Sequence, residues 1–292
     1  MSISAKNLIE IQKKQNKKRR FRTLLFILIF LFATYRGLFS ILLISADIKI
    51  TAHRGSTVLS PENSISSVVE ALALNVDYIE VDAQLTKDGK VILLHDRTFK
   101  RTAGITSKPK DLTYEEMQNI NIGYYKPSAF ETPVPLLEDV IRLCRYSCGL
   151  NIELKDYGNN DGLPAKVVQL LEDYDYIDGC YITSTSSKFL KEVRNLNPNI
   201  KIGLITSSTM LTTYINNSFV DFYSVNYLSL SPSITLYIRS SKKKIHAWTP
   251  SSKITVETAI RMGANNIITD DISTTKFTII SMTKELIEKG SN

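Results

Sequence analysis

Three carboxylates in the sequence have the spacing of a metal site. Glu80 and Asp82 alternate within the β-like run 78–86, so their side chains point to the same face of a strand. Glu153 occupies a similar place in the run 150–154. Carboxylates that face inward among apolar neighbours repel one another unless a cation holds them. Hard oxygen ligands suit Mg²⁺ or Ca²⁺ better than zinc, so we predict one divalent cation, Mg²⁺ or Ca²⁺, at these three residues.

A structural ion-pair network is the alternative for the same acids. Arg54 follows the first β-like run, and Lys155 lies two residues after Glu153 on the same face of its strand. Either basic side chain is able to neutralise a carboxylate without a metal. The spacing alone favours the metal site over this network.

Two of the three histidines end β-like runs beside these acids. His53 follows the run 48–52, and His95 ends the run 91–95. Imidazole groups exchange protons near neutral pH, so the pair can supply one general acid and one general base. His246 lies inside the run 245–248, and we expect it to be structural.

An alternation of β-like runs and amphipathic helical runs must position these side chains. This pattern of βα units predicts an α/β fold, a closed (β/α)8 TIM barrel, whose site lies at the carboxyl ends of the strands. The β-like runs are 48–52, 78–86, 91–95, 150–154, 180–183, 202–206, 222–226, 245–248 and 266–269, and the helical runs are 62–74, 136–148, 164–174, 187–196, 210–217, 233–239, 255–262 and a last one after residue 272.

The run 91–95 is one strand too many for an eight-stranded barrel. It follows Asp88-Gly89, and Asp-Gly between two β-like runs is a strong β-hairpin signal. We therefore expect it to pair with the second strand as a β-hairpin outside the barrel. Residues 97–135 have no strong period and contain four prolines, so they are predicted to form an insertion after strand 2.

The net charge of +7 is confined to the N-terminus. Residues 1–23 contain eight lysine and arginine residues and one glutamate, and the rest of the chain is neutral. The basic charge therefore does not form a binding face on the folded unit, which argues against a nucleic-acid-binding protein.

An apolar segment follows this basic tail. The sequence predicts a basic cytoplasmic tail over 1–23, an N-terminal transmembrane helix over 24–45 and the barrel domain over 46–292. Lysine and arginine before a first apolar segment keep the N-terminus in the cytoplasm, which places the barrel on the outer face of the cell membrane. Arg36 lies inside the span and costs about 2.5–3.5 kcal/mol there, so it calls for snorkelling or for a partner helix in the membrane. A cleaved signal peptide is the alternative.

Ordered motifs along the chain together resemble those of the glycerophosphodiester phosphodiesterase family. No single motif is decisive, but the ordered set is specific and covers about residues 48–272. The motifs are His53-Arg-Gly, Pro61-Glu-Asn-Ser64, Glu80-Val-Asp82, Leu85-Thr-Lys-Asp-Gly89, His95-Asp96, Val134-Pro-Leu-Leu-Glu138, Asn151-Ile-Glu-Leu-Lys155, Ala247-Trp-Thr249 and Ile267-Ile-Thr-Asp270.

The resemblance implies hydrolysis of glycerophosphodiesters to sn-glycerol 3-phosphate and an alcohol. It implies that the two histidines are the catalytic acid/base pair and that the three carboxylates bind the metal. The implied substrate-binding residues are Arg54 and Lys155 on the phosphate, Glu62 in support of the site, and Trp248 along the pocket. The family usually has threonine where this chain has Ser64, and the N-terminal segment is not part of the family core.

Two other functions remain open at this point. Relatives with the same two-histidine barrel act as phospholipase D-type enzymes on lysolipids or sphingolipids, which a barrel tethered beside a bilayer would reach. A catalytically inactive barrel that serves as a surface binding module is the second. The sequence also leaves open whether water or a neighbouring glycerol hydroxyl is the nucleophile, and which glycerophosphodiester or polymer is the substrate.

Overall fold

The computed structural model describes residues 13–31, 47–126, 130–158, 161–206 and 219–290. The chain divides into two compact units, residues 1–44 and residues 45–292. Each unit is described by itself.

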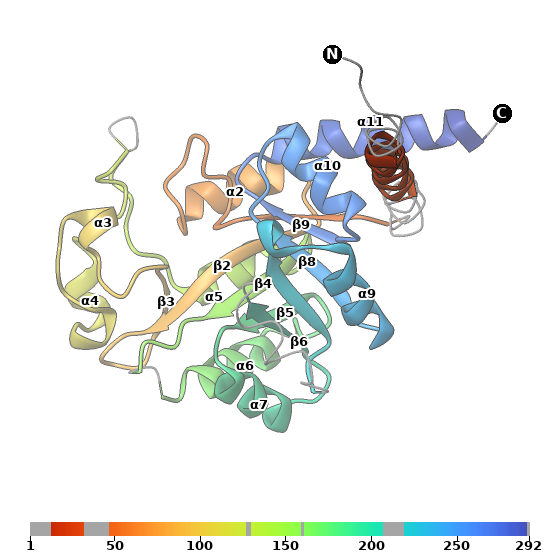
Figure 1. Ribbon diagram of the computed structural model, residues 1–292. Helices are drawn as coiled ribbons and strands as arrows, with labels where there is room; N and C mark the ends of the chain where they lie inside the picture. Colours follow the sequence, from red (N-terminus) through yellow and green to blue (C-terminus); the bar gives the residue numbers. More distant parts are fainter. Residues whose placement is uncertain (1–12, 32–46, 127–129, 159–160, 207–218, 291–292) are drawn as a thin grey trace, which may run out of the picture. The chain divides into compact units, whose positions relative to one another are not determined.

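The second unit is a closed barrel of eight parallel strands, as the sequence predicts (Figure 1). Each observed strand lies within about two residues of a predicted β-like run, and pairing of β1 with β2 closes the barrel. In order around the barrel the strands are β1 (Lys49–Ala52), β9 (Asn266–Thr269), β8 (Lys244–Trp248), β7 (Phe222–Asn226), β6 (Lys201–Thr206), β5 (Cys180–Ser184), β4 (Gly149–Leu154) and β2 (Tyr78–Leu85).

Amphipathic helices surround the strands. Several begin with a serine that accepts a hydrogen bond from the first turn, as Ser64 and Ser252 do in complete capping boxes. The predicted helical run 210–217 lies outside the described residues. The helices are α2 (Ile65–Ala73), α5 (Leu137–Cys144), α6 (Leu163–Asp173), α7 (Ser187–Leu196), α9 (Pro232–Ser240), α10 (Lys253–Arg261) and α11 (Ile272–Gly290), with a 3₁₀ turn, η2, at Tyr227–Ser229.

Alternation along each strand separates the packing core from the site. In β2, Ile79, Val81 and Ala83 are fully buried in the apolar core between strands and helices. Glu80 and Asp82 point to the other side, into the barrel. Because the apolar residues of the strand pack against the surrounding helices, its carboxylates point into the barrel interior.

Aromatic rings fill part of the barrel interior away from the site. Tyr78 stacks on Tyr181 with ring centroids 4.5 Å apart, and Phe222 stacks on His246 at 3.9 Å. His246 is buried and does not line the cavity described below. This arrangement agrees with the structural role expected for His246.

The predicted β-hairpin and the insertion are both present. β3 (Val91–Leu93) pairs antiparallel with β2, with Ala83 opposite Leu93, and stays outside the barrel. The insertion contains single turns of helix, α3 (Lys100–Ala103), η1 (Pro109–Asp111) and α4 (Tyr114–Met117), which are too short to leave a periodic pattern in the sequence.

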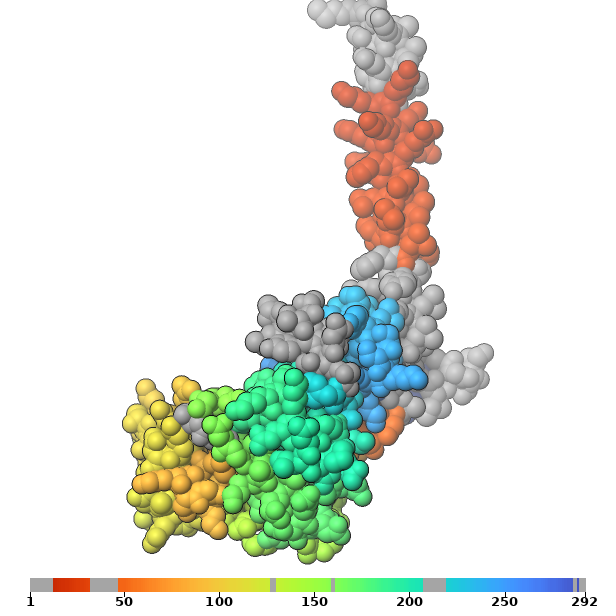
Figure 2. All heavy atoms as spheres, turned by 90° about the horizontal axis from the view of Figure 1, so that it is seen from below, coloured from red at the N-terminus to blue at the C-terminus, as the bar shows by residue number. Residues whose placement is uncertain are grey.

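The insertion has an apolar core of its own. Phe99, Met117 and Ile122 are buried there with Ile92 of β3, apart from the main core. Figure 2 shows its yellow atoms gathered at one side of the barrel unit. A separate core gives the insertion a fixed shape, so its side chains are able to take part in the site.

The first unit contributes a helix over residues 13–31. Its apolar side chains, among them Phe26, Phe30 and Leu31, are exposed. Within the residues that the structure describes, no helix has both the length and the apolar character needed to cross a membrane. Most of the predicted span 24–45, including Arg36, falls in residues 32–46 and lies outside the described part of the chain.

Candidate active site

The three predicted metal-binding carboxylates lie together at one end of the barrel. Glu80 and Asp82 are adjacent inward positions of β2, and the parallel register sets Asp82 beside Glu153 of β4. One oxygen of each lies within 4.8 Å of the others. Glu80 is 3% exposed and Asp82 is fully buried. The structure therefore brings the whole predicted cluster into a single site.

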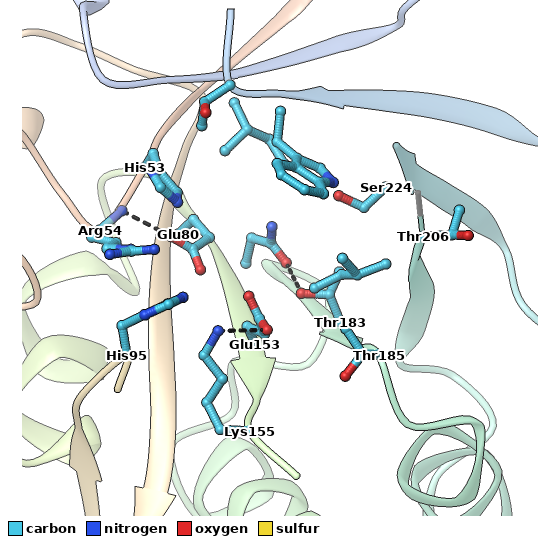
Figure 3. Close-up of a pocket in the computed structure, with 15 residues that line it drawn as sticks. His53, Arg54, Glu80, His95, Glu153, Lys155, Thr183, Thr185, Thr206 and Ser224 are labelled. Atoms are coloured by element: carbon cyan, nitrogen blue, oxygen red, sulfur yellow. Dashed lines mark hydrogen bonds and ion pairs between the residues drawn. The ribbon is translucent and has the colours of Figure 1, made fainter. Parts of the chain in front are cut away.

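A cavity of about 450 Å³ opens at the carboxyl ends of the strands beside this cluster. Figure 3 shows the charged side chains and the histidines on one side of the cavity and hydroxyl-bearing side chains on the other. The lining residues are His53, Arg54, Glu80, His95, Asn151, Glu153, Lys155, Thr183, Thr185, Ile205, Thr206, Ser224, Trp248, Thr249 and Ile268.

His53 follows β1 and is held by a carboxylate from the end of the barrel sequence. Its Nδ1–H donates to Oδ1 of Asp270 at 2.7 Å, so Nε2 is the nitrogen that can meet a substrate. Burial works against the imidazolium, but the Asp270 hydrogen bond and the charge of Glu80 outweigh it and raise the pKa of His53. Asp270 belongs to a motif quoted above, but its partnership with His53 depends on closure of the barrel.

His95 lies on the opposite side of the acid cluster, just after β3. Its Nδ1 contacts Oδ1 of Asp96 at 2.8 Å, and its carbonyl accepts a hydrogen bond from the hydroxyl of Tyr157. Gln84 fixes the same segment because its amide donates to the carbonyls of Leu94 and Asp96. Burial lowers the pKa of His95, so the two histidines have pKa shifts of opposite sign.

A left-handed backbone conformation places Arg54 over the acids. Arg54 has φ 56°, and its N–H donates to Oε2 of Glu80 at 2.8 Å while its Nε lies 3.4 Å from Oδ2 of Asp82. Gly55 follows with φ 81°, and a Cβ there would come within 2.3 Å of Oγ of Ser67 in α2. The His-Arg-Gly motif thus has a structural reason for its glycine.

Asn63 orients Asp82 from both ends of its amide. Its Nδ2 donates to Oδ2 of Asp82 at 2.7 Å, and its Oδ1 accepts the N–H of Asp82 at 3.0 Å. This explains the asparagine of the Pro61-Glu-Asn-Ser motif.

Lys155 is the second basic group beside the acids. Its Nζ lies 2.6 Å from Oε1 of Glu153 and 2.9 Å from Oδ1 of Asp82. Burial alone would lower the pKa of Lys155, but the charges of both carboxylates raise it. In the same way burial would raise the pKa of Asp82, but Lys155 and Arg54 hold it well below its usual range.

The other two predicted substrate-binding residues take different places. Trp248 ends β8 and lines the cavity. Glu62 does not line the cavity; its Oε1 instead accepts a hydrogen bond from Nη1 of Arg54 at 2.9 Å. Arg101 of the insertion binds Glu62 from behind, and no sequence pattern pointed to that arginine.

The chemistry of the acid cluster fits a divalent cation. Burial and the charge of Asp82 raise the pKa of Glu80 to about 8, and burial also raises that of Glu153. Oδ1 of Asp82 is buried, and Nζ of Lys155 lies 2.9 Å from it. A cation bound by these oxygens would relieve the repulsion, and carboxylate oxygens are the ligands that Mg²⁺ and Ca²⁺ prefer.

A family model matches most of the barrel unit. The model of the glycerophosphoryl diester phosphodiesterase family matches residues 53–274, a stretch that contains every site residue named above. The chain therefore belongs to the glycerophosphoryl diester phosphodiesterase family, whose members are phosphoric diester hydrolases.

Individual relatives cover most of the chain. A glycerophosphodiester phosphodiesterase from Caldanaerobacter subterraneus subsp. tengcongensis is 30% identical over 230 residues, which is 77% of this chain and 95% of the relative. Lysophospholipase D GDPD3 from Mus musculus is 26% identical and covers 76% of this chain and 79% of its own length. The structure of an Oleispira antarctica phosphodiesterase in complex with the product sn-glycerol-3-phosphate matches with a TM-score of 0.74 at 20% identity over 82% of this chain and 99% of that chain, which shows the shared fold.

Proposed function

We propose that this chain hydrolyses glycerophosphodiesters to sn-glycerol 3-phosphate and an alcohol, with a divalent metal and two-histidine acid/base catalysis. The observation that carries the proposal is one cavity in which two histidines, each oriented by its own carboxylate, lie beside a cluster of three acids. The glycerophosphodiester phosphodiesterase relative and the product bound in the Oleispira antarctica structure support the choice of substrate.

The basic side chains of the site would bind the phosphodiester. Arg54 and Lys155 both line the cavity next to the acids, where their charges can neutralise the non-bridging oxygens of the phosphate. A cation held by Glu80, Asp82 and Glu153 would add Lewis-acid stabilisation of the same charge. Trp248 would pack against the organic part of the substrate.

The two histidines would divide the proton transfers. Each Nδ1 is engaged by a carboxylate, so each Nε2 can exchange a proton in the cavity. His53, with its raised pKa, is the better donor of a proton to the leaving alkoxide. His95, with its lowered pKa, is the better acceptor of a proton from the nucleophile. Opposite shifts of this kind are typical of acid and base pairs.

Product analysis with the full chain tests this function. The purified protein in detergent would be incubated with glycerophosphocholine, and released sn-glycerol 3-phosphate would be measured enzymatically in Mg²⁺, in Ca²⁺ and in excess chelator. We expect release that stops in chelator and returns with one of the two cations. Full activity in chelator would remove the metal requirement, and absence of sn-glycerol 3-phosphate would refute the reaction.

A phospholipase D-type action on lysolipids is the second candidate. The similarity to the mouse lysophospholipase D supports it, since that relative spans most of the barrel domain. The ratio of kcat/KM for lysophosphatidylcholine to that for glycerophosphocholine separates the two functions. A ratio above one favours the lysolipid, and a ratio below one favours the free glycerophosphodiester.

We also propose that the N-terminal segment attaches the enzyme to the cell membrane by a single pass. The basic residues 1–23 followed by the apolar residues 24–45 support a cytoplasmic N-terminus and a barrel on the outer face, with a partner helix that accommodates Arg36. Protease added to intact cells stripped of their wall should digest the barrel and spare the tail. A barrel that resists the protease until the cells are lysed would contradict this orientation.

A further inference from the structure

Arg101, in helix α3 of the insertion, binds two carboxylates at once. Its Nε and Nη2 donate to the two oxygens of Asp96 at 2.8 and 3.1 Å. Its Nη1 and Nη2 donate to the two oxygens of Glu62 at 2.6 and 2.7 Å. None of these three residues lines the cavity. The guanidinium therefore lies outside the cavity lining, against two carboxylates that contact lining residues.

Each of these carboxylates holds a functional residue in turn. Asp96 contacts Nδ1 of His95 at 2.8 Å through Oδ1, the same oxygen that accepts from Arg101. Glu62 accepts from Nη1 of Arg54 at 2.9 Å through Oε1, which also accepts from Arg101. A single arginine is thus one carboxylate away from a catalytic histidine and one carboxylate away from the phosphate-binding arginine.

The Glu62 carboxylate is held firmly because it is largely buried. The Glu62 side chain is 11% exposed, and burial alone would raise its pKa, but hydrogen bonds from Arg101 and the charge of Arg54 lower it. The backbone N–H of Glu62 also donates to the hydroxyl of Tyr125, a second residue of the insertion. The insertion therefore fixes Glu62 through both its side chain and its backbone.

We propose that Arg101 is a positioning residue, which orients His95 through Asp96 and Arg54 through Glu62. This inference rests on the proposed function of His95 and Arg54. It gives the insertion a part in catalysis itself.

The geometry requires an arginine and not merely a positive charge. A planar guanidinium can present two edges to two carboxylates, whereas a lysine ammonium is a point charge that cannot hold both in fixed orientations. An Arg101→Lys variant should keep the charge and lose most of the orientation. Arg101→Ala removes both.

The experiment compares the full-length Arg101→Ala and Arg101→Lys enzymes with wild type. We expect kcat/KM for glycerophosphocholine to fall about 10–100-fold in both variants, as for other residues that orient catalytic ligands. The loss should appear in kcat through His95 and in KM through Arg54. In the Asp96→Asn background, Arg101→Ala should lower kcat much less than in wild type, because one pathway is already broken.

Arg142→Ala is the matched control. Arg142 pairs with Asp139 on the exterior of α5 and should leave kcat/KM unchanged. The inference is overturned if Arg101→Ala retains wild-type kcat/KM, if Arg101→Lys restores it fully, or if the losses in Arg101→Ala and Asp96→Asn are additive.

Binding of sn-glycerol 3-phosphate, measured by calorimetry, separates this inference from the proposed function. Arg101→Ala should weaken binding of this ligand about tenfold through Arg54, whether or not wild type turns over the diester. Unchanged affinity would overturn the Arg54 half of the inference. Thermal unfolding of each variant shows that the barrel is still folded when the affinity is measured.

Discussion

Glu80 has to lose a proton before it can bind a divalent cation. Burial and the neighbouring charge of Asp82 raise the pKa of Glu80 to about 8 in the metal-free protein. The cation competes with that proton, so metal affinity should rise with pH until Glu80 is ionised. Glu153, whose pKa burial also raises, acts in the same direction.

The size of the effect follows from the pKa of Glu80. When the pH is below the pKa of Glu80, about 8, each drop of one pH unit leaves about tenfold less of the ionised carboxylate. Apparent metal affinity should therefore fall about tenfold from pH 7 to pH 6. Binding at pH 6 should release about one proton for each cation. Above pH 9 the affinity should become constant.

Calorimetry with Mg²⁺ and Ca²⁺ in two buffers of different ionisation enthalpy measures both quantities. Glu80→Gln should bind the cation weakly at every pH and lose most of the proton release. Glu138→Gln, a change on the outer helix α5, should keep the wild-type pH dependence. Equal affinity at pH 6 and pH 8 with no proton exchange would refute the link between burial of Glu80 and metal binding.

Three further changes have expected outcomes. The Asp270 carboxylate orients His53 and raises the pKa of its imidazole. Asp270→Asn should therefore lower kcat roughly tenfold or more, and it should move the alkaline limb of the kcat–pH profile to lower pH. His246 is 3% exposed, and burial lowers its pKa to about 3, below its ordinary unfolded value. At pH 5 the His246 imidazole therefore binds a proton in the unfolded chain but not in the folded chain, which lowers the free energy of unfolding by about 2 kcal/mol. Denaturant unfolding of His246→Phe should lack that part of the pH dependence. Gly55→Ala should lower stability by about 1–3 kcal/mol, because φ is 81° and a Cβ would press on Ser67; an unchanged unfolding midpoint would contradict this.

The regular part of the fold could be predicted because each strand carries its own signal. Runs such as 180–183 and 202–206 correspond closely to β5 and β6. The Asp-Gly turn marked β3 as a hairpin strand outside the barrel. The insertion could not be predicted in detail, because its single helical turns are held by tertiary contacts around Phe99 and Met117.

The site residues also differ in how far the sequence could predict them. Glu80, Asp82 and Glu153 could be grouped because strand periodicity and barrel closure bring their side chains together. The contact between Glu62 and Arg54 could not be predicted, because it depends on single loop residues, Arg54 and Asn63, that have left-handed backbone conformations. Contacts between distant segments, such as that of His53 with Asp270, need the closed barrel and leave no local pattern.

The pH dependence of metal binding reports on one ligand, whereas the proposed reaction depends on acid/base catalysis by two histidines. Its most direct test is the rate of sn-glycerol 3-phosphate release from glycerophosphocholine by His53→Ala and His95→Ala at saturating metal. Both variants should remain folded and bind the cation, and each should lose about 10²–10⁴-fold in kcat. A rate within about tenfold of wild type in either variant would contradict the assignment of that histidine.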